Sequence, residues 1–155
     1  MREIKLRGYS VERLCADSQW VEGFGVMTTE YANGTKDYTM FTYYGNYQVY
    51  GKSVGQCTGL HDKNGKEIFE GDIVKLEFDG IERIFEVGIE TVVREVKSHP
   101  SFADKYAKVA ITGVVFKWEG FQLFPCVDYQ GMSDTERMEI IGNIFENPEL
   151  LEVAK

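Results

Sequence analysis

The stretch from Gly55 to Leu76, GQCTGLHDKNGKEIFEGDIVKL, constrains the fold most, because it holds two turn signals with apolar residues between and after them. Asn64-Gly65 accepts positive φ, and Gly71-Asp72 stands directly before a run in which apolar and charged residues alternate. Alternation with period two is typical of a half-buried strand. The sequence therefore predicts a tight reversal followed by a strand over residues 72–79.

Similar runs of alternating, β-branched or aromatic residues recur along the chain. They predict strands over residues 3–9, 24–31, 38–44, 46–50, 109–118, 121–127 and 138–145, and one long strand or a strand pair around 85–93. Turn dipeptides separate several of them, at Asn33-Gly34, Asp79-Gly80 and Glu119-Gly120. We expect residues 10–22 to form one helical turn or irregular structure, and 97–107 and 128–136 to be loops.

The C-terminal segment carries a different pattern. Gly142 in the last predicted strand indicates a bulge or a close backbone approach. Asn147 as a cap, Pro148 at the first helical position and Glu149 in the first turn predict a short helix. The predicted fold class is thus mainly β with minor α, made of antiparallel strands with a short C-terminal helix.

Size and charge limit the functions that are open to the chain. Its 155 residues suit a single domain over 1–155, in which we expect an N-terminal β-rich part (about 1–54) to pack on the rest (about 55–155). The net charge of -8 repels a phosphate backbone, which makes nucleic acid an unfavoured partner unless basic residues gather on one face. The residues that would have to converge are Arg2, Lys5, Arg7, Tyr43 and Tyr47.

Cysteine usage and hydrophobicity bear on the compartment. Cys15, Cys57 and Cys126 are odd in number and far apart, which favours reduced thiols in the cytoplasm over a disulfide framework. No apolar stretch is long enough to span a bilayer, and the first residues lack the apolar core of a secretory signal. We therefore expect no membrane association.

Aromatic residues are dense between residues 38 and 50. They are either a stacking platform for bases or cross-strand pairs that stabilise a sheet or a protein interface, and the acidic charge favours the second interpretation. We expect the partner to be another protein or a second copy of this chain. The candidate interaction surface consists of Tyr43, Tyr44, Tyr47 and Tyr50.

The sequence holds no recognisable catalytic, cofactor-binding or metal-binding set, and we predict none. His61-Asp62 and nearby Cys57 suggest an acid–base pair or zinc ligands, but neither the other histidine nor the other cysteines lie at ligand spacing. Asp62 is better explained by bonds to backbone amides of the following turn. The residues interpreted as structural are Gly59, Asp62, Asn64, Gly65, Gly71, Asp72, Gly142, Asn143, Asn147 and Pro148.

Three blocks of sequence, MREIKLRGY, GQCTGLHDKNGKEIFEGDIVKL and EIIGNIFENPELLE, resemble the YopX family of phage and prophage proteins from low-GC Gram-positive bacteria. The resemblance implies a β-rich fold with an SH3-like barrel from about Gly55 onward, phage or prophage origin, and location in the host cytoplasm. It implies no activity, since the family has no assigned catalytic residues.

These observations leave three functional hypotheses. The first is a non-enzymatic phage accessory protein that binds another protein, or itself, through aromatic strand surfaces. The alternative is nucleic-acid binding by an SH3-like barrel, which requires a continuous basic face. The third is a small-molecule enzyme, which requires a deep pocket with titratable groups of shifted pKa.

Overall fold

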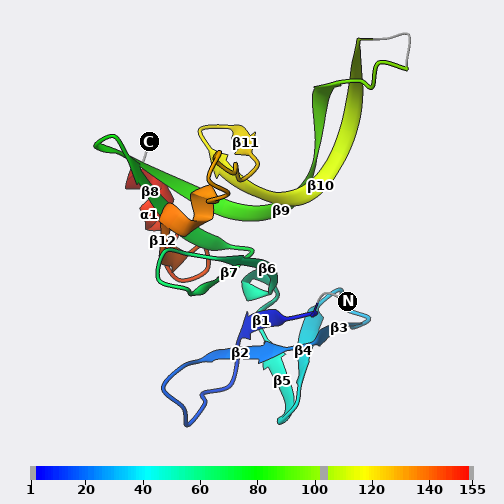
Figure 1. Ribbon diagram of the computed structural model, residues 1–155. Coiled ribbons are helices and arrows are strands. Elements are labelled where there is room, and N and C mark those ends of the chain that lie inside the picture. Colours follow the sequence, from blue (N-terminus) through cyan, green and yellow to red (C-terminus); the bar gives the residue numbers. More distant parts are fainter. Residues whose placement is uncertain (1–2, 102–104, 154–155) are drawn as a thin grey trace.

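The computed structural model describes residues 3–101 and 105–153, and it places them in antiparallel sheets with a few short helices (Figure 1). The mainly β class with one short C-terminal helix is confirmed. The described strands form open sheets and no closed barrel, so the SH3-like barrel that the family resemblance implies stays a prediction.

The first sheet joins the start of the chain to the stretch that begins at Gly55. Its order is β2-β1-β6-β7, formed by β1 (Leu6–Tyr9), β2 (Trp20–Gly23), β6 (Gly55–His61) and β7 (Glu67–Phe69). The prediction of helical or irregular structure for residues 10–22 was wrong at its end, because β2 begins at Trp20. Four residues are too few to show alternation, and β2 forms by pairing along the whole of β1.

A three-stranded meander follows, with β3 (Gly25–Glu30), β4 (Lys36–Thr42) and β5 (Gly45–Val49). It confirms the predicted hairpin around Asn33-Gly34, where Gly34 has φ 84°. Met40 of β4 is fully buried and packs beside Gly8 of β1, which joins the meander to the first sheet. A short 3₁₀ helix, η1 (Gly51–Ser53), then leads into β6.

The largest sheet has the order β11-β10-β9-β8-β12 and is formed by β8 (Asp72–Phe78), β9 (Ile81–Lys97), β10 (Tyr106–Trp118), β11 (Phe121–Leu123) and β12 (Met138–Asn143). The predicted strand at 72–79, the single long strand and the return at 121–127 all lie here, although β11 ends at Leu123. The predicted loop at 128–136 contains the start of a 3₁₀ helix, η2 (Asp134–Arg137), which a Ser133–Glu136 capping box begins.

The end of the chain folds back on β12. The register of β12 against β8 shifts between Ile140 and Gly142, and a Cβ at Gly142 would lie 2.6 Å from Asn147 Oδ1. The bulge expected at this glycine is therefore present, and what approaches it closely is the Asn147 side chain and not another stretch of backbone. Helix α1 (Glu149–Val153) closes the chain directly after Pro148.

The main hydrophobic core lies between the five-stranded sheet and β7. Its buried members are Ile68, Val74, Phe85, Val87, Phe116 and Met138. A separate cluster of aromatic rings joins the first sheet to the turn after β12, with ring centroids 5.2–6.3 Å apart, and consists of Tyr9, Trp20, Tyr50 and Phe145. The described helices are all too short or too polar to cross a bilayer.

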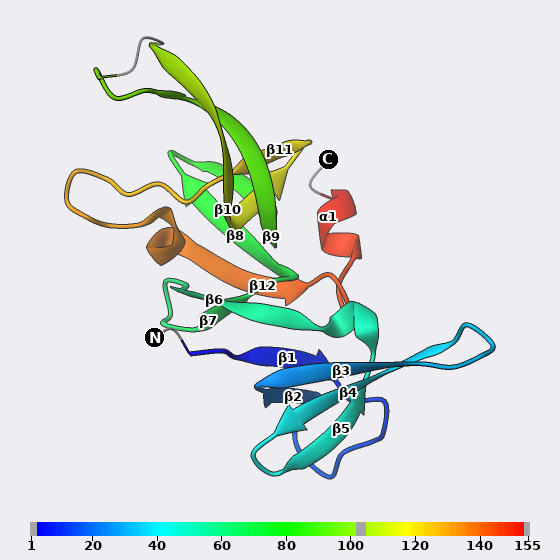
Figure 2. The same cartoon turned by 90° about the vertical axis from the view of Figure 1, so that its right-hand side faces the viewer.

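β9 and β10 are longer than the strands beside them in the five-stranded sheet. Their outer part extends away from the rest of the molecule in both views (Figures 1 and 2). We call residues 92–111 the arm; the structure describes 92–101 and 105–111 of it. The turn between β8 and β9 lies at the opposite end of the five-stranded sheet (Figure 1).

Candidate interaction surfaces

The arm is a two-stranded ribbon with free backbone edges. β8 pairs with β9 only as far as Glu86, and β11 pairs with β10 only from Phe116 onward. In the described part of the arm, β9 and β10 pair with each other and with no third strand. A lone ribbon is marginally stable in water, and unpaired edges are templates for another chain. The arm therefore has the geometry of a binding element.

The two faces of the arm differ in character. Directly paired residues share a face, so Val96 and Ala107 lie on one side, and Lys97 and Tyr106 on the other. The first face is apolar except for Arg94, whose guanidinium lies 5.8 Å from the ring centre of Phe124 at the root of the arm. The apolar face consists of Val92, Val96, Ala107, Val109 and Ile111.

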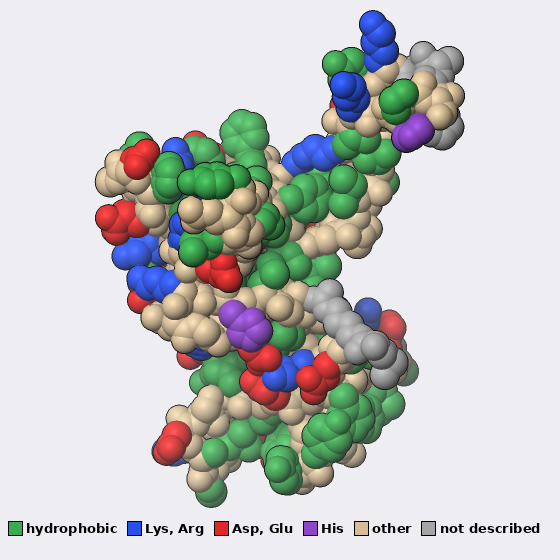
Figure 3. All heavy atoms as spheres, viewed as in Figure 1, with side chains coloured by type: hydrophobic (Ala, Val, Ile, Leu, Met, Phe, Trp, Pro, Cys, Tyr) green, Lys and Arg blue, Asp and Glu red, His purple; other side chains and the backbone are tan. Residues whose placement is uncertain are grey.

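The other face combines apolar and basic groups. Val93 and Tyr106 on this face are 62% and 60% exposed. Lys97 and Lys108 share the face, and Lys105 precedes β10; none of these three lysines forms an ion pair with a described residue. Figure 3 shows basic and hydrophobic side chains together over the described part of the arm. Glu95 lies on the same face directly opposite Lys108, so this exposed surface carries apolar and basic groups together with one acidic group among the described residues.

The tyrosines predicted to form an interaction surface divide into two pairs. Tyr43 and Tyr44 form the turn between β4 and β5 and are 87% and 95% exposed. Their backbone is held by Thr42, whose hydroxyl donates to the Gly45 carbonyl at 2.8 Å and accepts from the Tyr44 amide at 3.1 Å. The ring of Phe24 lies 5.3 Å from that of Tyr43. Two aromatic side chains on a held turn thus project into solvent.

The other two tyrosines contact the rest of the protein: Tyr47 is half-buried, and Tyr50 packs on other rings although it is 46% exposed. Tyr47 lies directly opposite buried Met40, and the Tyr50 ring packs on Tyr9 and Phe145 at 6.3 and 5.6 Å between centroids. The structure therefore does not bring all four tyrosines together. Tyr47 and Tyr50 belong to the packing between sheets.

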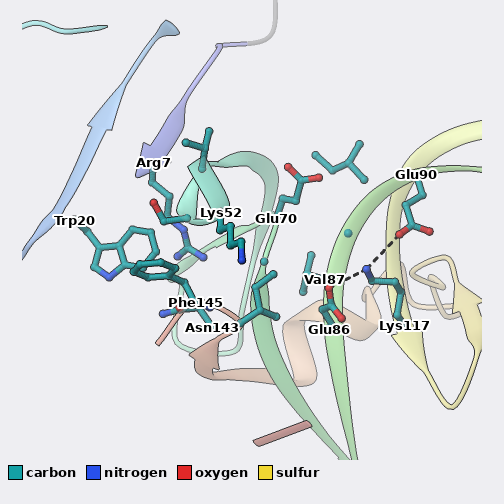
Figure 4. Close-up of a pocket in the computed structure, with 16 residues that line it drawn as sticks. Arg7, Trp20, Lys52, Glu70, Glu86, Val87, Glu90, Lys117, Asn143 and Phe145 are labelled. Carbon is teal, nitrogen blue, oxygen red and sulfur yellow. Dashed lines mark hydrogen bonds and ion pairs between the residues drawn. The ribbon is translucent and has the colours of Figure 1, made fainter. Parts of the chain in front are cut away.

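A pocket lies at the seam between the first sheet and the five-stranded sheet, and Figure 4 shows its lining. On one side, Arg7 of β1 reaches between the rings of Trp20 and Phe69, 4.7 and 4.8 Å from their centres. Its Nη2 donates to Asp72 Oδ1 at 2.6 Å, and Asp72 Oδ2 accepts from the Phe69 amide at 2.8 Å. Burial raises the pKa of Asp72 above its usual value, against the opposing effect of Arg7.

The far side of the same pocket is also paired. Lys117 Nζ lies 2.8 Å from Glu86 and 3.2 Å from Glu90, as the dashed lines in Figure 4 mark. Burial alone would lower the pKa of Lys117, but the bonds to the two carboxylates raise it. Two groups of paired charges, around Arg7 and Lys117, therefore line the cavity of about 270 Å³; Lys52 and Glu70 also line it, and neither forms an ion pair with a described residue.

Ion pairs also occupy the described basic residues near the start of the chain. Lys5 donates to both oxygens of Glu67, at 2.9 and 2.8 Å, and Arg7 is bound to Asp72. Neither is free to meet a phosphate, and Tyr43 and Tyr47 point in different directions as described above. Arg2 lies outside the described residues. A basic face built on this set does not form among the described members.

The turn after β6 is organised by Asp62. One of its carboxylate oxygens accepts from the amides of Asn64 at 2.9 Å and Lys66 at 3.0 Å, and the other accepts from Ile140 of β12 at 3.2 Å. Burial acts to raise the pKa of Asp62, but these three bonds lower it below its usual value. Asp62 therefore holds the turn and also fixes it to the neighbouring sheet.

Of the remaining structural residues, Gly59 lies within β6, where its register against β7 shifts, and Asn143 ends β12; Gly65 and Gly71 lie at turns. Gly59, Gly65 and Gly71 have φ of 79°, 77° and 88°, a region that favours glycine. Asn143 Oδ1 accepts from the amides of Phe145 and Glu146 at 3.1 and 2.8 Å. The Asn147 side chain accepts from the Asn143 amide at 3.3 Å, which ties the start of the helical segment back to β12.

Cys57 and His61 both lie on β6 and do not meet. Four residues along a strand span about 13 Å, and no hydrogen bond joins the two side chains in the part of the chain that the structure describes. The described residues also hold no group of three or more His, Cys, Asp and Glu side chains arranged to bind a metal ion.

The family assignment follows from comparison of the whole sequence. The model of the family described as YopX protein matches residues 15–152, which is most of the chain. The chain belongs to the YopX family. The match includes β2, the meander and the arm, regions that the three sequence blocks leave out.

Comparisons with individual proteins add little to the YopX assignment. The crystal structure of protein EF1440 from Enterococcus faecalis has 23% sequence identity with this chain and a TM-score of 0.41, over 96% of this chain and 97% of that one. At that TM-score, nothing about the fold or function of this YopX protein follows from the similarity. No match was found among curated proteins.

Two features were missed by reasoning from sequence. The first is the Arg7–Asp72 pair, because a contact between residues 65 positions apart leaves no local pattern. The second is the arm as a projecting element. Its signal was the length of β9, which has 17 residues. The strands on either side of the β9–β10 hairpin, β8 beside β9 and β11 beside β10, are too short to pair along all of it.

Proposed function

We propose that this YopX-family chain is a non-enzymatic accessory protein that binds a host or phage protein through an aromatic surface formed by Phe24, Tyr43 and Tyr44. The observation that carries the proposal is the pair of adjacent tyrosines at the β4–β5 turn, each exposed over more than four-fifths of its surface. Large exposed aromatic side chains on a fixed backbone are typical anchors of protein interfaces.

The local geometry supports binding with little loss of conformational entropy. The Thr42 hydroxyl bonds to the backbone of Tyr44 and Gly45, and the Phe24 ring supports Tyr43 from the bend between β2 and β3. A surface that is already ordered pays less to bind than a mobile one. The mutually neutralised charges around Arg7 and Lys117 support a binding role over a catalytic one, since an active site needs groups left free to react.

The proposed setting is the cytoplasm of a bacterium that carries the phage or prophage. The three cysteines are free thiols, and Cys15 and Cys126 are exposed. Exposed free thiols suit a reducing compartment.

The test is affinity capture from host cells with three forms of the full chain: wild type, Tyr43→Ser/Tyr44→Ser, and the control Tyr129→Ser, whose tyrosine is 96% exposed elsewhere. We expect one protein to be retained by the wild type and the control and lost by the double variant. Equal retention by all three forms would contradict the proposal. Captured nucleic acid that nuclease removes would favour the alternative, a nucleic-acid-binding protein.

A further inference from the structure

We propose that a pocket at one end of the main hydrophobic core binds a small aromatic carboxylate, with the ring inside the pocket and the carboxylate paired with Arg83. This inference goes beyond the proposed function, because both the site and the class of ligand differ from those of the aromatic surface at the β4–β5 turn. It depends on the position of the pocket, on its lining and on one arginine that no described carboxylate neutralises.

The pocket forms where the chain crosses one face of the five-stranded sheet. β11 and β12 lie at opposite edges of this sheet, so the residues that join them, 124–137, pass across β10, β9 and β8. The crossing segment covers the face that carries Phe85 and Phe116, but it leaves a cavity of about 220 Å³ beside them. We call this cavity the Arg83 pocket.

The lining of the Arg83 pocket is apolar except for two charged residues. Paired residues share a face, so Leu76 lies on the same side of the sheet as Arg83 and, two residues further along β9, Phe85. Leu123 of β11 lies opposite Phe116 in the same way. The other lining residues are Trp118, Phe124, Pro125, Asp134 and Met138. Because Phe85 and Phe116 belong to the buried core, a ring in the pocket lies directly against the core.

The size of the pocket suits one ring system. Protein cores usually leave no void much larger than a water molecule, and an engineered apolar cavity of about 150 Å³ binds benzene. A cavity of about 220 Å³ has room for an aromatic ring with a short substituent. Leu123 in the lining is 41% exposed, so the pocket is open to solvent at β11 and a ligand can enter there.

The two charged residues of the pocket differ in how well they are neutralised. Asp134 Oδ2 accepts from the Cys126 amide at 3.1 Å, and its Oδ1 lies 3.9 Å from Arg137. Arg83 forms no ion pair with a described residue; its guanidinium carbon lies 5.4 Å from the centre of the Trp118 ring. Packing on the ring face positions the guanidinium and leaves its edge N–H groups free to donate. The group without a counter-charge is the cation, so the pocket selects an anion.

A carboxylate attached to a ring satisfies both parts of the site. A guanidinium binds a carboxylate through two parallel N–H···O bonds, and an aromatic ring packs favourably on the edges and faces of other rings. An inorganic anion gains nothing from the apolar lining, and an uncharged ring leaves Arg83 without a counter-charge. The competing occupant is an apolar side chain of a protein partner, which also fills the cavity but supplies no charge.

The experiment follows the two indole N–H signals of the full chain by NMR during titration with indole-3-acetate. Trp118 lines the Arg83 pocket, whereas Trp20 lies at the seam between the sheets, so the two signals report on different sites. We expect a saturable shift of the Trp118 signal and an unchanged Trp20 signal. The affinity per atom that is usual for small ligands gives a Kd of about 1 mM or tighter. Indole, which lacks the acid, and tryptamine, which is a cation, should bind about tenfold more weakly.

A charge variant tests the role of the arginine. Arg83→Gln should weaken the binding of indole-3-acetate about tenfold and leave the binding of indole unchanged, which shows that the pocket is intact. The matched control is Arg13→Gln, the same substitution at an exposed arginine outside the pocket, and it should bind like the wild type. Tyr43→Ser/Tyr44→Ser should also bind like the wild type, so the failure of this proposal and of the proposed function can be told apart.

Several outcomes would overturn the proposal. They are the absence of a saturable shift at Trp118, equal affinity for the three probes, a shift confined to Trp20, and equal losses of affinity in Arg83→Gln and Arg13→Gln. If affinity capture retained a host protein on the wild type and lost it on Arg83→Gln, while none of the probes bound, the pocket would be assigned to a protein side chain instead.

Discussion

The two halves of the β9–β10 hairpin share one uninterrupted register but have opposite environments. Near the body, Val87 and Phe116 are paired and almost fully buried in the core. In the arm, Lys97 and Tyr106 are paired in the same way and are exposed. Pairing alone thus does not decide what a strand does. The layers that cover it decide whether its side chains stabilise the fold or are available to a partner.

The largest difference in the free energy of unfolding is expected between two aromatic residues of β10, one in the core half of the hairpin and one in the arm. Phe116→Ala removes a ring that packs edge-to-face on Phe85, at 6.1 Å between centroids, and should lower the free energy of unfolding by about 3–5 kcal/mol. Tyr106→Ala in the arm should change it by less than about 0.5 kcal/mol. Chemical denaturation of both variants measures this. Similar losses would show that the arm is part of the cooperative core.

The next largest effect on the free energy of unfolding is expected at the seam between the first sheet and the five-stranded sheet. Arg7→Leu keeps an apolar side chain between Trp20 and Phe69 but leaves the Asp72 carboxylate buried without its counter-charge, which should cost about 3 kcal/mol at neutral pH. Arg7→Leu/Asp72→Asn should recover most of this loss, because the amide is neutral and its oxygen can still accept from the Phe69 amide.

The same variant has a defined pH dependence. The pKa of Asp72 is already raised by burial in the folded wild type, and removal of Arg7 raises it further. Between that raised value and the usual carboxyl pKa, the folded state binds more protons than the unfolded state, so lowering the pH stabilises the fold. The deficit of Arg7→Leu should shrink as the pH falls through this window. A deficit that grows would mean that Asp72 does not carry the effect.

The contrast between local and long-range contacts also explains what the sequence could predict. Alternation along β8, β9 and β10 and the turn dipeptides identified most strands, because these signals lie within ten residues. Gly142 indicated its bulge for the same reason. β2 was missed because its pairing with β1, and not its own four residues, determines it.

The candidate surfaces were less predictable than the fold. The aromatic residues from 38 to 50 predicted an interaction surface, but Tyr47 on β5 is half-buried opposite Met40, and the Tyr50 ring packs on Tyr9 and Phe145. Only the turn kept Tyr43 and Tyr44 exposed. The basic character of the arm was hidden in the sequence, because Lys97 and Lys108 meet on one face only through the pairing of two strands.

The smallest difference in the free energy of unfolding is expected between variants of two acidic residues of β9. Glu86 lies 2.8 Å from Lys117 in the proximal half, and Glu95 lies opposite Lys108 in the arm without a close ion pair between them. Glu86→Gln should cost about 0.5 kcal/mol, because both partners are partly exposed and Glu90 still neutralises Lys117. Glu95→Gln should leave the free energy of unfolding unchanged, because Glu95 is exposed and forms no close ion pair. Chemical denaturation of the two variants measures the difference. If Glu95→Gln altered stability more than Glu86→Gln, charge in the arm would serve the fold, and the division between a covered and an uncovered half of the hairpin would fail.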